Sequence, residues 1–188
     1  MKDNLPRYKN HRLRNYDYSS DGFYHVEFNT KFSVHELGEV VEDDDYKILY
    51  SDAGKILEEE WFKTGEIRKE VRLGKYKIMP DHFHGIIQIG NPVLPGFIPP
   101  SEQYLFIPFT PGHINKFGPQ YKTLSNLVGA LKGACKRKIQ EFNMHFEWQV
   151  SFHDEVIRDL VQLHHTENYI ENNIIQWKKD NKKVIKRK

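Results

Sequence analysis

Two histidines separated by a single residue, His82 and His84, are the side chains of this sequence best placed to do chemistry. They stand in the segment KYKIMPDHFHGIIQIG, residues 75–90, and apolar residues follow them at once. If the segment is a strand, both imidazoles point to one face, about 7 Å apart along the chain. Two imidazoles held in this way can share a divalent metal ion and leave coordination positions open for a substrate. The alternative is a pair of half-exposed histidines without a ligand, because the chain has ten histidines and such a spacing arises by chance.

The segment HTENYIENN, residues 165–173, adds a tyrosine and an asparagine at helical spacing. Tyr169 and Asn173 are four residues apart, so they share one face of a helix. If the neighbouring apolar stripe docks on the sheet, both side chains lie at the edge of the contact, where they can meet the histidine face. Asn173 would then offer a third metal ligand, and Tyr169 a nucleophile whose phenol needs help from a metal that polarises a phosphate. The alternative is an ordinary tyrosine of an amphipathic helix. The stripe consists of Ile170, Ile174 and Trp177.

The elements that must position these residues follow from hydrophobic periodicity and from turn residues. We expect strands at 22–32, 71–79, 82–89 and 148–159, helices at 53–69, 122–142 and 160–177, and a hairpin at 33–50. This order predicts an α+β fold, a ferredoxin-like split β-α-β antiparallel sheet with two helices on one face and an extra C-terminal helix that carries Tyr169. Alternation along 82–89 places the apolar residues beneath the two helices, and we expect the histidine face to be uncovered.

Composition suggests one domain and a polyanionic partner. The 188 residues are enough for one domain. We expect a basic arm at 1–20, a single domain at 21–178 with a proline-rich insertion at 91–119, and a basic tail at 179–188. Basic ends around a chain whose net charge is only +2 favour nucleic acid as the partner. Solvated, frayed termini are the alternative.

Several classes of protein do not fit the sequence. The single cysteine, Cys135, excludes a disulfide framework or a thiolate metal cluster within the chain and fits a reducing compartment. The N-terminus is polar, so we expect no signal peptide. No apolar run approaches the length of a membrane span, and we therefore expect a cytoplasmic protein without a membrane partner. The acidic run EDDD at 42–45 is an alternative metal site, although a solvated turn is the more common role of such a run.

Four segments together resemble a known family. MPDHFHGIIQI resembles the HUH motif of single-tyrosine transposases, in which a hydrophobic residue separates two histidines, and YIENN resembles their tyrosine helix. RLRNYDYSSDGFYHVEFNT and WQVSFHDEVIRD resemble one bacterial branch, the REP-associated tyrosine transposases. The resemblance runs in order from Arg12 to Trp177, and only the segment 91–119 lies outside it. The chain departs from the branch in two places, with NNIIQW where the branch has a proline after NN, and with SFHDEVIR where it has aromatic residues and histidine.

The resemblance implies both a reaction and its residues. The reaction is metal-dependent nicking and rejoining of single-stranded DNA at hairpin repeats, through a 5′-phosphotyrosine, in a bacterial, nucleoid-associated protein. Tyr169 becomes the nucleophile, and His82, His84 and Asn173 become ligands of Mg²⁺ or Mn²⁺. The DNA partner is single-stranded or hairpin DNA, and the candidate contacts to its backbone are Arg7, Arg12, Arg14, Lys132, Lys136, Arg137 and Arg158.

Two other functions fit the same residues. One is a catalytically silent DNA- or RNA-binding protein on the same fold, and the other is a metallohydrolase that uses water and in which Tyr169 is structural. The sequence also leaves open whether the protein is a monomer or a homodimer, and whether the tyrosine helix docks on its own sheet or on that of a partner.

Overall fold

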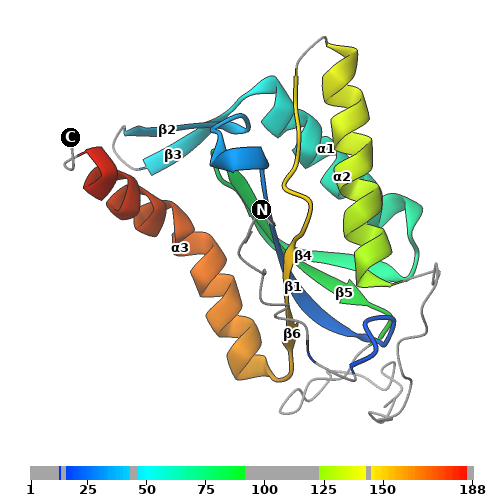
Figure 1. Ribbon diagram of the computed structural model, residues 1–188. Coiled ribbons are helices and arrows are strands. Elements are labelled where there is room, and N and C mark those ends of the chain that lie inside the picture. Colours follow the sequence, from blue (N-terminus) through cyan, green and yellow to red (C-terminus); the bar gives the residue numbers. More distant parts are fainter. Residues whose placement is uncertain (1–12, 14–15, 43–45, 92–122, 143–144, 186–188) are drawn as a thin grey trace, which may run out of the picture.

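The computed structural model describes residues 13, 16–42, 46–91, 123–142 and 145–185 (Figure 1). Three of the candidate DNA contacts, Arg7, Arg12 and Arg14, lie outside the described residues. The same holds for nearly all of the proline-rich segment and for residues 43–45.

A four-stranded antiparallel sheet forms the centre of the protein, with the strand order β4-β5-β1-β6. The first helix follows the first strand and its hairpin, and the second helix joins β5 to β6. This is the ferredoxin-like split β-α-β arrangement, so the predicted fold is confirmed. The strands of the sheet are β1 (Gly22–Asn29), β4 (Val71–Ile78), β5 (His82–Ile89) and β6 (His153–Ile157), and the helices are α1 (Asp52–Ile67), α2 (Leu124–Glu141) and α3 (Leu160–Ile185).

The expected hairpin between β1 and α1 is also confirmed. Strands β2 (Gly38–Glu42) and β3 (Tyr46–Tyr50) pair antiparallel in a separate two-stranded sheet. Helix α1 begins directly after it, and the Ser51 hydroxyl caps its first turn by accepting a hydrogen bond from the Gly54 amide at 3.1 Å.

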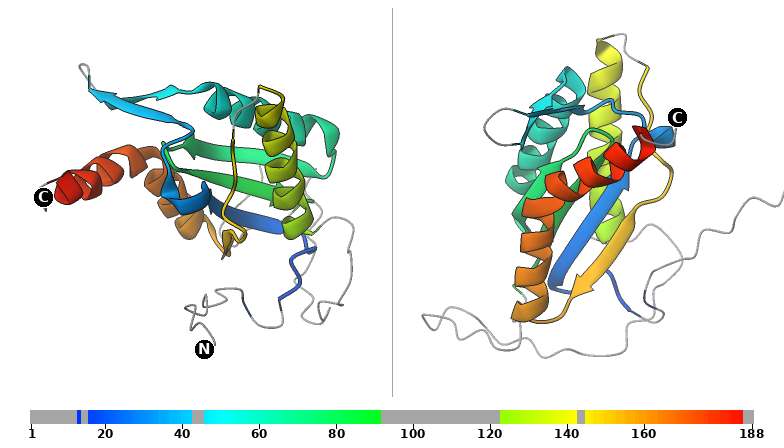
Figure 2. Two further views of the ribbon diagram at one scale, coloured as in Figure 1. Left: turned by 45° about the horizontal axis from the view of Figure 1, so that its top comes forward. Right: turned by 90° about the vertical axis from the view of Figure 1, so that its left-hand side faces the viewer.

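One face of the central sheet carries the main apolar core, and α1 and α2 cover it (Figure 2). Phe28 of β1 stacks on Phe83 of β5 with 4.8 Å between ring centroids, and Trp61 of α1 packs against the same Phe83 ring. Gly85 lies under this aromatic group, because a Cβ there would come within 2.8 Å of both the Phe83 and the Trp61 rings. Burying such side chains contributes roughly 2–3 kcal/mol each, so this face supplies most of the stability of the fold.

The expectation that the histidine face of the sheet is uncovered was wrong. Helix α3 crosses it on the side of the sheet opposite α1 and α2 (Figures 1 and 2). Ile170 of α3 packs there against Ile86 and Ile157, with Phe23 and Leu163 at the margin of this small cluster. Docking removes the apolar stripe of the helix and the isoleucines of the sheet from water, which favours this arrangement.

Three element boundaries differ from those predicted, each for a local reason. β1 ends at Asn29, because Phe32 and Ser33 adopt positive φ angles in a short 3₁₀ turn. β6 covers only 153–157, because the two carbonyls before it, of Gln149 and Ser151, bind the Lys132 ammonium. α3 continues to Ile185, since no proline follows Asn173, and most of the expected tail at 179–188 is therefore helical. Within the described part of the chain, no helix is both long enough and apolar enough to cross a membrane.

Candidate functional site

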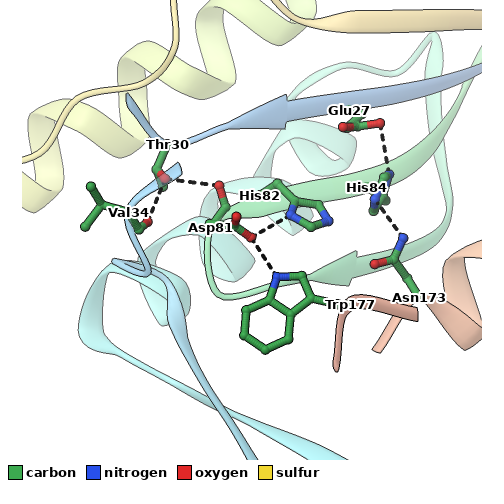
Figure 3. Close-up of polar contacts among 8 residues, drawn as sticks. All are labelled: Glu27, Thr30, Val34, Asp81, His82, His84, Asn173 and Trp177. Carbon is green, nitrogen blue, oxygen red and sulfur yellow. Dashed lines mark hydrogen bonds and ion pairs between the residues drawn. The ribbon is translucent and has the colours of Figure 1, made fainter. Parts of the chain in front are cut away.

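The candidate site lies where α3 crosses β1 and β5, and His84 is at its centre (Figure 3). The His84 residue is 1% exposed. Its Nδ1 is 3.2 Å from His25 Nε2, and its Nε2 is 3.0 Å from the amide nitrogen of Asn173. The Glu27 carboxylate lies 3.8 Å from the same Nδ1. Cross-strand pairing explains this grouping, because Glu27 is directly opposite His84 in the β1–β5 ladder and opposite His153 in the β1–β6 ladder.

The second histidine of the pair is oriented by a carboxylate. His82 Nδ1 is 2.7 Å from Asp81 Oδ1, and the Trp177 indole of α3 donates to the same oxygen at 3.1 Å. Burial raises the pKa of Asp81, but the hydrogen bonds from His82 and Trp177 outweigh this and lower it overall. The rings of His82 and His84 lie 4.8 Å apart between centroids and nearly perpendicular. Because Nδ1 of His82 is engaged by Asp81, its Nε2 is the atom that this imidazole can give to a metal. His84 can offer its Nε2 only if the contact with the Asn173 amide nitrogen is given up.

Burial keeps the central imidazoles neutral. It lowers the pKa of His84 to about 2, with the neighbouring His82 and His25 adding to the effect, and it lowers the pKa of His25 to about 4. Near pH 7 both rings are therefore uncharged. A neutral imidazole is the form that binds a metal ion.

Tyr169 lies over this cluster and is open to solvent, with 49% of the residue exposed. Its ring meets the His84 ring edge-on, with 5.3 Å between centroids. Burial and the negative charge of Glu27 raise the pKa of Tyr169, and a hydrogen bond with Asn173 opposes them in part. The phenol therefore keeps its proton at neutral pH. The predicted meeting of the tyrosine helix with the histidine face is found in the structure.

A cavity of about 730 Å³ opens beside Tyr169, between β1, β6 and the first turns of α3. Its walls include Glu27 and Glu155, together with two histidines that had no assigned role, His153 and His165. The volume lies in the range of a small-ligand site. The two carboxylates make the cavity unfavourable for a phosphate unless a cation accompanies it.

The donor chemistry of the site fits a divalent metal ion, although the protein offers few ligands. No group of three or more His, Cys, Asp or Glu side chains in the described part of the chain is arranged to hold a metal. The predicted ligands are two neutral imidazoles and one amide, which leave positions for water and substrate. In the structure the amide nitrogen of Asn173, not its oxygen, faces His84 (Figure 3). Ligation through the Asn173 oxygen therefore requires a half-turn of the amide group.

Comparisons with known proteins place this site on a known fold. No profile of a protein family matches the sequence. An uncharacterized protein of Haemophilus influenzae is 25% identical over 170 residues, which cover 90% of this chain and 89% of that protein. The structure of a REP-associated tyrosine transposase bound to a REP hairpin matches with a TM-score of 0.55 and 14% identity, over 88% of this chain and 73% of that one. This chain has the fold of a REP-associated tyrosine transposase. A candidate transposase from Deinococcus radiodurans matches with a TM-score of 0.39.

The transposase fold separates the predicted DNA contacts into different layers. Arg158 is exposed just before α3, and its backbone amide donates to the side chain of Gln162, one of the residues that line the cavity. Lys136 and Arg137 lie on α2, in the layer on the other side of the sheet. Lys132 does not fit a role at the DNA backbone, because it is 9% exposed and its ammonium binds two main-chain carbonyls, at 2.6 and 3.2 Å. Burial lowers the pKa of Lys132 to about 8.

Four residues of the site were not found from the sequence. His25 and Glu27 alternate along β1, but their approach to His84 depends on the pairing of β1 with β5, which the sequence does not specify. Asp81 directly precedes the histidine pair, between the two predicted strands, and it had no predicted role. Trp177 was assigned to the apolar stripe, whereas its indole nitrogen reaches Asp81.

Proposed function

We propose that this protein is a metal-dependent DNA strand transferase, which nicks and rejoins single-stranded DNA at hairpin repeats through a 5′-phosphotyrosine intermediate. One observation carries the proposal: Tyr169 and Asn173 of α3 both contact His84 of the histidine pair on β5, and 89 positions separate His84 from Asn173. The fold supports a DNA substrate, because the transposase that shares it was solved with a REP hairpin bound.

In the proposed reaction the Tyr169 oxygen attacks a phosphorus atom of the DNA backbone. A bond forms between the tyrosine oxygen and phosphorus, and the bond from phosphorus to the 3′-oxygen breaks. The phenol loses its proton, and the leaving 3′-oxygen gains one to become a hydroxyl. A 3′-hydroxyl that attacks the phosphotyrosine reverses these steps and joins two strands.

The surrounding residues have distinct tasks. His82 and His84, with Asn173 as the third candidate, would hold Mg²⁺ or Mn²⁺, which when bound would polarise the phosphate and offset its charge. The exposure of Tyr169 lets a DNA strand reach the phenol. Asn173 partly offsets the raised pKa of the Tyr169 phenol, which couples the nucleophile to the proposed ligand set. The negative charge of Glu27 and Glu155 beside Tyr169 makes a cation necessary for a phosphate to approach.

One observation favours a second function, a DNA- or RNA-binding protein that has lost catalysis. Both nitrogens of His84 already have partners within the protein, and the Asn173 amide presents nitrogen rather than oxygen. A site closed in this way could be purely structural. The experiment below separates the two functions.

The test is covalent attachment to DNA. Labelled single-stranded hairpin oligonucleotides, taken from repeats that flank the gene, are incubated with the full chain and Mg²⁺ or Mn²⁺, or with EDTA, and run on a denaturing gel. We expect a shifted band that requires metal and is absent in Tyr169→Phe, while this variant still binds the hairpin. Tyr76→Phe is the matched control, because its hydroxyl bonds Glu58 on the opposite side of the sheet.

Three outcomes contradict the proposal. A shifted band that persists in Tyr169→Phe shows that another residue is the nucleophile. Tight hairpin binding without a band, for every repeat and metal tried, favours the binding protein. Metal-dependent cleavage without any covalent band favours a hydrolase that uses water.

A further inference from the structure

His25 is a buried histidine that the proposed reaction does not use. It is 6% exposed, and its ring stacks on that of His84 with 5.3 Å between centroids and 19° between planes. Its Nε2 lies 3.2 Å from His84 Nδ1. Burying two imidazoles with their ring nitrogens facing each other costs free energy unless one nitrogen donates a hydrogen bond to the other.

We propose that His25 is a positioning residue for the metal site: its Nε2 accepts a hydrogen bond from the Nδ1–H of His84, which leaves His84 Nε2 without a proton and able to bind a metal. The proposal rests on the proposed function, because it assumes that His84 binds a metal. It goes further by assigning to β1 the task of selecting the tautomer of a ligand on β5.

The contacts of His84 explain why an acceptor is needed at Nδ1. The Asn173 amide can donate a hydrogen bond through its nitrogen or accept one through its oxygen, so it fits either tautomer of His84. The Glu27 carboxylate, at 3.8 Å from Nδ1, is beyond hydrogen-bond distance. His25, with its Nε2 at 3.2 Å, is therefore the group that can accept a hydrogen bond from the Nδ1–H of His84. Without it, the proton can move to Nε2, donate to the Asn173 oxygen and block the ligand atom.

Two substitutions at the same position separate this role from simple packing. His25→Gln removes the ring but keeps an oxygen acceptor of similar reach. His25→Phe keeps the ring and its stacking but removes the acceptor. Packing alone therefore predicts that His25→Phe is the milder change, whereas positioning predicts that His25→Gln is milder. His164→Phe is the matched control, because the His164 side chain is 67% exposed on α3.

The measurement is Mn²⁺ affinity of the full chain without DNA, by titration with detection of free Mn²⁺ by electron paramagnetic resonance. Partners of metal-ligating histidines typically change metal affinity by about 10–100-fold. We expect a loss of that size in His25→Phe and at most about a threefold loss in His25→Gln. Long-range ¹⁵N–¹H NMR of the metal-free wild type should show the proton of His84 on Nδ1, and this second readout does not depend on a variant that folds.

Several results would overturn the positioning role. One is an unchanged Mn²⁺ affinity in His25→Phe, and another is an equal loss of Mn²⁺ affinity in both His25 variants. A third is a wild-type His84 that carries its proton on Nε2. A fourth is an Mn²⁺ affinity in His84→Ala that equals that of the wild type. Failure of the strand-transfer proposal looks different. In that case Mn²⁺ binds at the histidines and depends on the residue at 25, but no covalent DNA adduct forms.

Discussion

The two faces of the central sheet are built from the same strands but differ in what holds them. Along β5, Phe83 and Ile87 face α1 and α2 within a large apolar core. His84 and Ile86 face α3, where three buried isoleucines form a much smaller cluster. The first face is stabilised by packing, and the second by a few polar contacts around that cluster. The comparison teaches that the reactive groups are placed where the stability of the fold depends on them least.

Polar contacts also set the position of α3. Asn173 bonds His84, and Trp177 bonds the Asp81 carboxylate that orients His82. Tyr169, Asn173 and Trp177 recur every four residues, so one stripe of the helix carries the nucleophile and both contacts to the histidine pair. The docking of α3 and the geometry of the metal site are therefore coupled.

The largest expected effect is the loss of covalent adduct formation with DNA in a variant that keeps its fold. His82→Ala removes one of two imidazole ligands, so metal-dependent adduct formation should fall to the background of the EDTA control. The free energy of unfolding should change little, because the main core does not include this side chain. The measurements are the denaturing gel and urea unfolding, with the exposed His145→Ala as control. Adduct formation at the wild-type rate in His82→Ala would contradict the metal assignment.

Neighbouring isoleucines on opposite faces give a direct comparison of the two. Ile87→Ala opens a cavity in the main core and should lower the free energy of unfolding by about 2–5 kcal/mol. Ile86→Ala loosens only the cluster under α3, so it should lower this free energy less but reduce the rate of adduct formation more, because α3 can open locally. Urea unfolding and the adduct rate of the two variants check this. Equal effects of both substitutions would show that the faces do not differ as described.

The smallest expected effect concerns DNA contacts. Arg158→Gln should reduce hairpin affinity and lower the slope of log affinity against log salt by about 0.7, the value for one phosphate contact to a single strand. Arg137→Gln removes the same charge from α2, in the other layer, and should leave the slope unchanged. Binding titrations at several salt concentrations measure both. A slope that falls equally in Arg137→Gln would indicate that the DNA follows α2 as well.

The fold and the meeting of Tyr169 and Asn173 with the face of the sheet that carries the histidine pair were predictable from the sequence. Alternation in β5 fixes which side chains share a face, and four-residue spacing does the same in α3. The histidine face was expected to be uncovered, and this was wrong because α3 covers it. Ile86, an apolar residue on the histidine side, indicated that part of this face is buried.

Other features depend on distances that periodicity does not give. The approach of His25 to His84 requires the pairing of β1 with β5. Lys132 was assigned to the surface because of its charge, although it follows Val128 by four residues and precedes Cys135 by three, and both of these are buried. Its spacing from these buried residues indicates burial more reliably than its charge indicates exposure. The two main-chain carbonyls that bind its ammonium cannot be inferred from the sequence.

The most direct test of the central claim is to identify the amino acid that becomes linked to DNA. The adduct formed with Mn²⁺ is digested with trypsin and nuclease, and the peptides are sequenced by mass spectrometry. The peptide from residues 159–178 contains a single tyrosine, Tyr169. We expect this peptide to carry the added nucleotide mass on Tyr169. A nucleotide mass on any other residue, or none in a sample that has cleaved DNA, would contradict the assignment of the α3 face as the active site.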